Sequence, residues 1–92
     1  MKTSVIYILF FIGVSGPQYV GSTFWPESRF KKHFRELKSG IHKNKKLQQR
    51  WNESEKEGFA IIVETVVASA RGQAEHKWMK YLDKKYGTIC NI

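Results

Sequence analysis

Two long apolar runs dominate the sequence, and both have the composition of β-strands. Residues 4–12 and residues 59–67 are rich in β-branched and aromatic side chains. The first run carries no charge, as expected of a strand buried on both faces. A shorter run at residues 18–22 follows a turn cluster of glycine and proline. Residues 4–22 therefore predict a β-hairpin, and residues 59–67 predict a third strand.

The remaining segments show the spacing of amphipathic helices. Phe30, Phe34 and Leu37 recur at i, i+4 and i+7 on one face. Three helices are predicted in this way, over residues 27–38, 44–52 and 73–85. The order is hairpin, two helices, strand and helix, with no internal repeat or linker. We expect a single domain over residues 1–92 of the α/β class (α+β type), with a small sheet flanked by helices.

The first apolar run has a second interpretation, as a secretory signal peptide. Residues 5–14 resemble its apolar core, and residues 14–16 resemble a small-residue cleavage site. The run is shorter than the roughly 20 residues that a transmembrane helix needs. Cys90 is the only cysteine, which favours a reducing, intracellular setting, because small secreted domains usually carry several disulfides. These patterns alone leave both interpretations open.

Positive charge is concentrated in one part of the chain. The formal net charge is +8, and nine of the 16 Lys and Arg residues lie between Arg29 and Arg50, where Glu36 is the only acid. Such a block produces a field that attracts phosphate in nucleic acid or at an anionic membrane, although it also fits an ordinary solvated face. The residues that we expect to contact nucleic acid are Lys31, Lys32, Arg35, Lys43, Asn44, Lys45, Lys46 and Gln48.

Two tyrosines and a basic pair are candidates for catalysis. Tyr7 and Tyr19 lie on opposite strands of the predicted hairpin and can share a face. Arg29 and His33 lie one turn apart on the helix that follows. A phenol becomes useful when cations lower its pKa or when it orients water, and an arginine can hold a phosphate oxygen. Cross-strand packing and an ordinary basic face are the alternatives.

Glu75 is a candidate metal ligand. It shares a helix stripe with Met79 and Leu82, and an inward carboxylate needs a partner because an unpaired buried charge is costly. A divalent ion with a preference for oxygen, Mg²⁺ or Mn²⁺, would supply that partner. The alternatives are stabilisation by the helix dipole or an ion pair with Arg71. Glu64, in the third strand, is the competing ligand.

In combination, these residues resemble the GIY-YIG nuclease family, especially its phage and homing-endonuclease branch. Residues 5–7 stand in the place of the first family motif, and residues 19–23 look like the second. Further segments that are similar to the family are residues 27–34, 39–44, 74–78 and 90–92. The main departure is Val5, which replaces the glycine of the first motif. That glycine is a backbone position rather than a reacting group.

The resemblance implies a three-stranded antiparallel sheet flanked by helices, and phosphodiester hydrolysis with one divalent ion, Mg²⁺ or Mn²⁺. It implies that Tyr7 helps to activate the attacking water, assisted by Tyr19 and by His33 or His42. Arg29 would stabilise the developing charge, and Glu75 would hold the metal. The family pattern further implies that Asn91 supports the site.

The leading hypothesis is a metal-dependent DNA endonuclease, phage-borne or part of a mobile element, that works inside a cell on double-stranded DNA. One active site would nick one strand, and specificity would come from the basic helices, a protein partner or a homodimer. The second hypothesis is a catalytically inactive nucleic-acid-binding protein on the same scaffold. The third is a secreted cationic peptide released after Gly16. We favour an intact hairpin, because cleavage there would remove Tyr7 from the partners that follow it.

Overall fold

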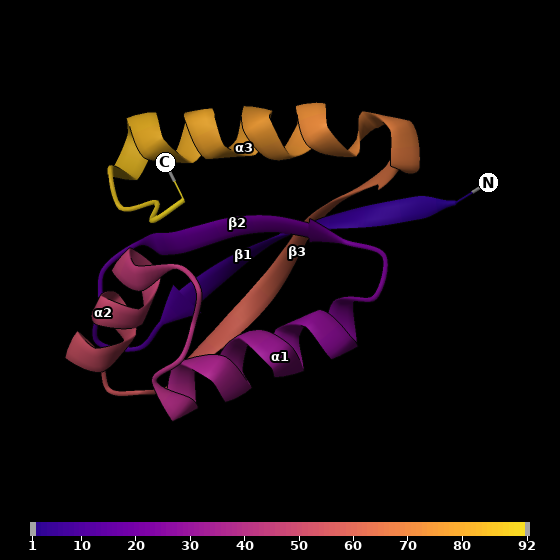
Figure 1. Ribbon diagram of the computed structural model, residues 1–92. Helices are drawn as coiled ribbons and strands as arrows, with labels where there is room; N and C mark the ends of the chain where they lie inside the picture. The colour runs from indigo at the N-terminus through magenta and orange to yellow at the C-terminus, as the bar shows by residue number, and fades with distance from the viewer. Residues whose placement is uncertain (1, 92) are drawn as a thin grey trace.

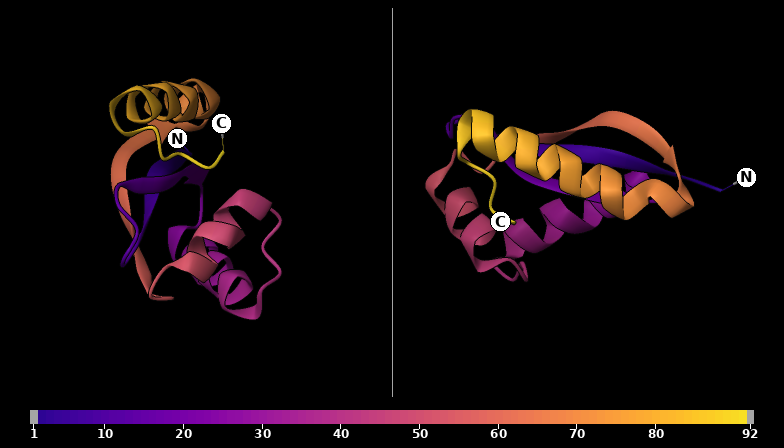
Figure 2. Two further views of the ribbon diagram at one scale, coloured as in Figure 1. Left: turned by 90° about the vertical axis from the view of Figure 1, so that its left-hand side faces the viewer. Right: turned by 90° about the horizontal axis from the view of Figure 1, so that it is seen from above.

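A three-stranded sheet lies between two layers of helices (Figure 1). The computed structural model describes residues 2–91. Its elements are β1 (Thr3–Phe11), β2 (Pro17–Thr23), α1 (Pro26–Ser39), α2 (Lys45–Glu53), β3 (Gly58–Val67), the short 3-10 helix η1 (Ala68–Ala70) and α3 (Arg71–Tyr86). Helix α3 covers one face of the sheet, and α1 and α2 cover the other, as the end-on view in Figure 2 shows. The predicted fold class is confirmed.

The first apolar run forms the central strand of the sheet. The strand order is β2-β1-β3, and both pairings are antiparallel. The hairpin predicted for residues 4–22 is therefore present, with Tyr7 of β1 opposite Gly21 of β2. Within residues 2–91, no helix is long and apolar enough to cross a membrane.

Alternation along β1 divides the apolar core in two. Ile6 and Ile8 pack under α3, whereas Tyr7, Leu9 and Phe11 face α1 and α2. The second group meets buried residues of the two helices, namely Leu37, Leu47 and Trp51. Trp51, one helical turn after Leu47, is thus a core residue. Because Tyr7 belongs to this half of the core, its ring points toward helix α1, which carries Arg29 and His33.

The helix boundaries follow local capping chemistry. Helix α1 begins at Pro26 and ends before Gly40, whose positive φ of 77° suits glycine. Asn44 caps α2 by accepting a hydrogen bond from the Leu47 N–H at 3.0 Å. Each predicted helix lies within two residues of the observed one at both ends. The last helix begins two residues earlier than predicted, so that Gly72 lies in the first turn of α3, where backbone N–H groups have no intrahelical partner.

Candidate active site

Tyr7 is buried at the centre of the candidate site and packs against β2. Its side chain is 1% exposed, and its ring centroid lies 6.4 Å from that of Tyr19 and 5.0 Å from that of Phe30. The end of the phenol lies directly over Gly21, where a Cβ atom would overlap its oxygen. The two tyrosines therefore share a face, as the hairpin predicted, and the glycine leaves room for the Tyr7 phenol.

A chain of hydrogen bonds runs from Tyr7 through two histidines to the backbone. The Tyr7 oxygen lies 2.6 Å from Nε2 of His33, and His33 Nδ1 lies 2.8 Å from Nε2 of His42. The two imidazole rings are stacked, with an interplanar angle of 13°. At the far end, the backbone N–H of Asn44 donates to Nδ1 of His42 at 3.1 Å. Helix α1 supplies the first histidine, and the α1–α2 loop supplies the second.

The backbone amide fixes the direction of the whole chain. An N–H can only donate, so Nδ1 of His42 accepts and the proton of this neutral ring lies on Nε2. His42 therefore donates to Nδ1 of His33, which places the His33 proton on Nε2. His33 in turn donates to the Tyr7 oxygen. The phenol accordingly keeps its own proton for a group in the pocket.

Burial keeps these groups neutral. It raises the pKa of the Tyr7 phenol to about 12, although the Arg29 guanidinium beside the phenol opposes the rise. It lowers the pKa of His33 to about 3, with the positive charge of Arg29 adding to the effect. Burial also lowers the pKa of His42 and raises that of Tyr19. At neutral pH the hydrogen-bond chain is therefore made of uncharged rings.

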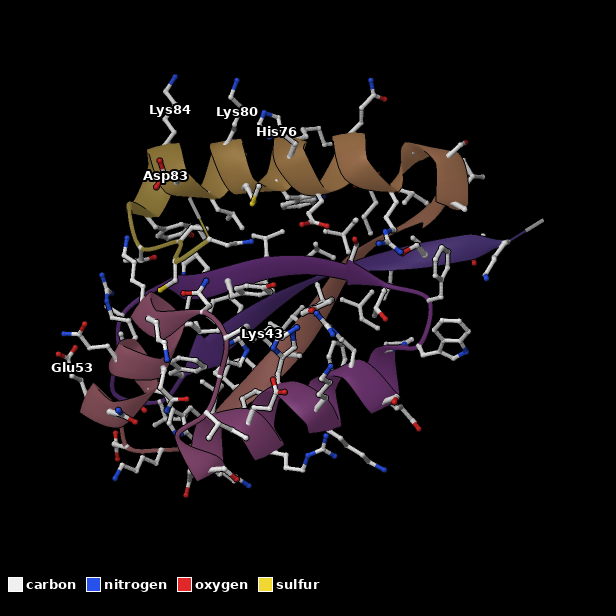
Figure 3. All side chains as sticks on the ribbon, viewed as in Figure 1. Lys43, Glu53, His76, Lys80, Asp83 and Lys84 are labelled. Atoms are coloured by element: carbon white, nitrogen blue, oxygen red, sulfur yellow. The ribbon has the colours of Figure 1, made fainter. Side chains whose placement is uncertain are left out.

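A small cationic cavity opens beside this chain. It has a volume of about 120 Å³, and its lining residues are Tyr19, Arg29, Lys32, His33, Glu36, His42, Lys43 and Asn44. Figure 3 shows Lys43 over the space between β2 and α1. Three cations and one acid line the cavity, so its net charge attracts an anion. A phosphate group matches this charge, and the guanidinium of Arg29 can hold its oxygens in a planar fork.

Glu75 approaches the same region from the opposite face of the sheet. Its Oε2 accepts a hydrogen bond of 2.5 Å from the hydroxyl of Ser22, on the edge strand β2. Its negative charge contributes to the raised pKa values of Tyr7 and Tyr19, so it is electrostatically coupled to both phenols. Within residues 2–91 it forms no ion pair. The alternative partner Arg71 packs over the Phe24 ring instead, at 5.0 Å.

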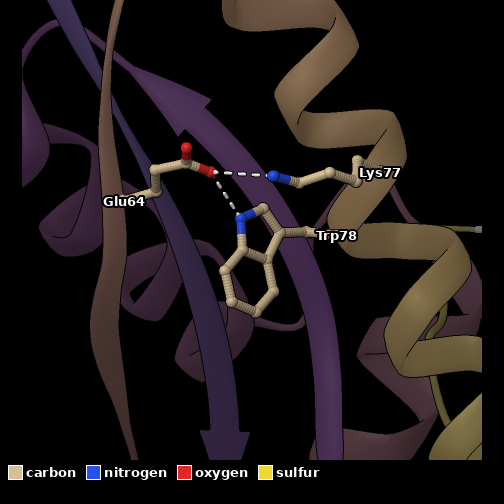
Figure 4. A network of polar contacts seen from close by, with 3 residues as sticks. All are labelled: Glu64, Lys77 and Trp78. Atoms are coloured by element: carbon tan, nitrogen blue, oxygen red, sulfur yellow. Dashed lines mark hydrogen bonds and ion pairs between the residues drawn. The ribbon is translucent and has the colours of Figure 1, made fainter.

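Glu64, the competing ligand, is engaged elsewhere. Its Oε1 accepts a hydrogen bond of 2.8 Å from the Trp78 indole and lies 3.7 Å from Nζ of Lys77 (Figure 4). These contacts join β3 to α3. The Glu64 carboxylate thus has two partners already, whereas among the described residues 2–91 the Glu75 carboxylate has only the neutral hydroxyl of Ser22.

The donor set at Glu75 fits a magnesium-like ion that is held mainly by its substrate. Among residues 2–91, no group of three or more His, Cys, Asp or Glu side chains could hold a metal. Mg²⁺ commonly binds through one or two carboxylates and takes its other ligands from water and substrate phosphate. The Glu75 carboxylate is half-buried, forms no ion pair within residues 2–91, and acts on the pKa of Tyr7 together with Arg29 of the cationic cavity, so it meets that requirement.

Asn91 binds the edge strand rather than the reacting groups. Its Oδ1 accepts from the Val20 N–H at 3.3 Å, and its Nδ2 donates to the Val20 carbonyl at 2.6 Å. The side chain thus pairs with β2 as a neighbouring strand would. Val20 lies between Tyr19 and Gly21, so this clamp fixes the backbone that carries one tyrosine and supports the other.

The expected nucleic-acid residues separate into three surface locations and one buried residue. Lys32, Lys43 and Asn44 line the cavity, whereas Lys31 and Arg35 line a separate groove on the other side of α1. Lys45 and Lys46 are exposed on α2. Gln48 departs from the expectation, because it is buried and its amide is used internally. It accepts from the His42 N–H and donates to the Leu37 carbonyl, both at 3.0 Å, so it holds the histidine loop.

Two contributors were missed at the level of sequence. Ser22 binds Glu75 across a separation of 53 residues, and the Asn44 backbone sets the proton positions of the histidines. Ser22 directly follows the Tyr-Val-Gly motif, and its position there is the one signal that pointed to it. A backbone donor leaves no signal in side-chain identity.

Comparisons with known proteins show the family of this chain. A family model described as the GIY-YIG catalytic domain matches residues 3–87, a range that includes Tyr7, Arg29 and Glu75. No curated protein matches the chain. Among solved structures, a mutant of the catalytic domain of the intron endonuclease I-TevI is similar, with a TM-score of 0.73 and 29% identity. The match covers 90% of this chain and 87% of that one. The chain therefore belongs to the GIY-YIG family, whose catalytic domains are endonucleases that act on DNA.

Proposed function

We propose that this chain is a metal-dependent endonuclease that cuts one strand of double-stranded DNA at each active site, with Mg²⁺ or Mn²⁺ as its cofactor. The observation that carries the proposal is that two charged groups act on one buried phenol from opposite faces of the sheet. The phenol is that of Tyr7, hydrogen-bonded to His33, and the charged groups are the guanidinium of Arg29 and the carboxylate of Glu75.

The geometry supports a division of roles around a phosphate in the cavity. Arg29 binds a non-bridging oxygen and stabilises the charge that builds up in the transition state. The Tyr7 oxygen, held by the His33 N–H, orients the attacking water, and Tyr19 packs beside it. A divalent ion held by Glu75 supplies positive charge to the phosphate when it is bound. His42 and Asn91 act as positioning residues, through His33 and through β2 respectively.

Cationic surfaces on both sides of α1 support double-stranded DNA as the substrate, because together they are broader than the backbone of a single strand. On one side is the cavity with Lys32 and Lys43. On the other side is a groove of about 720 Å³ with Lys31, Arg35, Lys38 and Lys56 on its rim. Phosphate contacts of this kind make binding strongly dependent on salt, because each one releases counterions.

Because each chain has one active site, a single chain would cut one DNA strand and produce a nick rather than a double-strand break. A double-strand break would require a homodimer, a protein partner or a second visit. The similarity to an intron endonuclease supports a role on a phage or mobile element, within the host cell.

The test is incubation of supercoiled plasmid with the protein and Mg²⁺ or Mn²⁺, with EDTA as the control. We expect nicked circles to appear before linear product, and only with a metal. Salt-dependent binding without cleavage in either metal would favour the alternative of an inactive nucleic-acid-binding protein on the same scaffold.

A further inference from the structure

The turn between β2 and α1 presents an exposed tryptophan on a fixed backbone. Trp25 is 65% exposed, whereas Trp51 is 1% exposed in the core. The backbone of Trp25 is held on both sides. Its N–H donates to Oγ1 of Thr23 at 3.1 Å, and its carbonyl accepts from the Arg29 N–H at 3.0 Å. The indole is thus a large apolar surface in solvent, with little freedom at its base.

Two cations flank the aromatic surface. Trp25 packs edge-to-face on Phe24, with ring centroids 5.7 Å apart. Nζ of Lys2 lies 4.3 Å from the Phe24 centroid and 5.2 Å from that of Trp25. The guanidinium of Arg71 lies 5.0 Å from Phe24. Aromatic rings beside cations form the surface on which unpaired bases stack while their phosphates are neutralised.

The position of Trp25 relates this surface to the active site. Trp25 precedes Arg29 by one helical turn, and Ser22, which binds Glu75, lies three residues before it. Four helical residues span about 6 Å. Successive phosphates of one strand are about 3.4 Å apart along the axis. A strand with its phosphate at Arg29 therefore reaches Trp25 within about two nucleotides.

We propose that Trp25 is a stacking residue, which packs its indole against a base of the cleaved strand within about two nucleotides of the scissile phosphate. Lys2 and Arg71 contact the adjoining phosphates. The inference rests on the proposed nuclease function and adds a site for a base to it. The flanking cations favour a nucleic acid over an apolar protein partner. Against an apolar protein surface, the charges of Lys2 and Arg71 would be left unpaired.

The experiment measures stacking without cleavage, in EDTA, on a short duplex that carries one unpaired base. We expect the duplex to quench the tryptophan emission of the wild type. Trp25→Phe removes most of the quench but keeps the dissociation constant within about twofold, because a phenyl ring still stacks. Trp25→Ala raises the dissociation constant about tenfold. Tyr81→Ala is the matched control. Tyr81 is 54% exposed on α3, and Lys85 Nζ lies 5.7 Å from its ring. Its replacement should leave both the quench and the dissociation constant unchanged.

The outcomes separate this inference from the proposed function. If the wild type cleaves plasmid but Trp25→Ala binds as tightly as wild type, stacking is overturned and the nuclease function stands. If Trp25→Phe keeps the full quench, or if heparin, which has charges but no bases, quenches the wild type equally, stacking is also overturned. A wild type that neither binds nor cleaves DNA removes both. Thermal unfolding checks that Trp25→Ala is folded, as the exposure of the ring predicts.

Discussion

The Tyr7 oxygen lies 2.6 Å from Nε2 of His33, and this hydrogen bond points toward the phenol. The direction of this hydrogen bond is set at the other end of the chain of contacts, where the Asn44 backbone N–H donates to His42. Because His33 already donates from inside, Tyr7 has its remaining lone pair and its own proton available to water and phosphate. The reactive end of the phenol is thus oriented by His33 and, through it, by His42 and the Asn44 backbone.

Replacing Tyr7 by phenylalanine tests the role of the phenol oxygen. We expect plasmid cleavage to fall at least about a hundredfold, the lower range for loss of a positioned acid–base group. The free energy of unfolding should fall by about 1–3 kcal/mol, because the His33 N–H loses its buried acceptor. Urea unfolding measures the second effect. Tyr86→Phe, at an exposed position of α3, is the control and should cleave normally. Wild-type cleavage by Tyr7→Phe would contradict the assigned role.

The low pKa of His33 predicts that stability falls in acid. The folded pKa is about 3, and that of the unfolded chain is near 6.5, so the unfolded state binds more protons between these values. The free energy of unfolding should therefore decrease as the pH falls from about 6.5 toward 3, by up to about 1.4 kcal/mol per pH unit for this histidine. His42, whose pKa is also lowered, adds to the slope.

Urea unfolding at a series of pH values measures this slope. His33→Gln should flatten it, because the titrating group is gone. His76→Gln should leave it unchanged, since His76 lies on the outer side of α3, away from the sheet (Figure 3). Equal slopes in wild type and His33→Gln would contradict the burial of a neutral histidine.

Gly21→Ala tests the close approach of Tyr7 to β2. The added methyl group would overlap the end of the phenol, which must then shift and disturb its hydrogen bond with His33. We expect a loss of about 1–3 kcal/mol in the free energy of unfolding, typical of overpacking, and slower cleavage. Gly72→Ala is the matched control, since a methyl group there meets nothing within 4 Å and a helical alanine stabilises by up to about 1 kcal/mol. A fully active, stable Gly21→Ala would show that the phenol is not held there.

Asn91→Ala tests the clamp on the edge strand. Two hydrogen bonds to Val20 are lost, which should lower the free energy of unfolding by about 1–3 kcal/mol. Hydrogen exchange of the Val20 amide should become faster, because its acceptor is removed, while exchange of the most protected amides of β3 should change only with global stability. An unchanged Val20 exchange rate would mean that the clamp does not form in solution.

The elements of the fold could be predicted from local pattern because their causes are local. The β-branched runs, the apolar spacing of Phe30 and Leu37, and the break at Gly40 each lie within a short window. The same local spacing predicted that Arg29 and His33, four residues apart, lie on one face of α1. The sequence also placed the two tyrosines on one hairpin, where their rings are 6.4 Å apart.

The rest of the site depends on contacts between distant segments. Val20 and Asn91 are 71 residues apart, and Ser22 and Glu75 are 53 apart, so no periodicity relates them. Gln48 is polar within a basic segment, which predicted a surface role. Its burial follows from backbone groups of Leu37 and His42 that need partners once α1 and α2 pack together.

The most direct test of the central claim compares wild type with Glu75→Gln in plasmid cleavage across a series of Mg²⁺ concentrations. Glu64→Gln is the matched control, because that carboxylate binds Trp78 and Lys77 instead of the site. We predict nicking by wild type and by Glu64→Gln, and a loss of at least about a hundredfold in Glu75→Gln, with DNA affinity in EDTA unchanged. Equal nicking by Glu75→Gln, or no nicked product from the wild type at any Mg²⁺ concentration, would contradict the account.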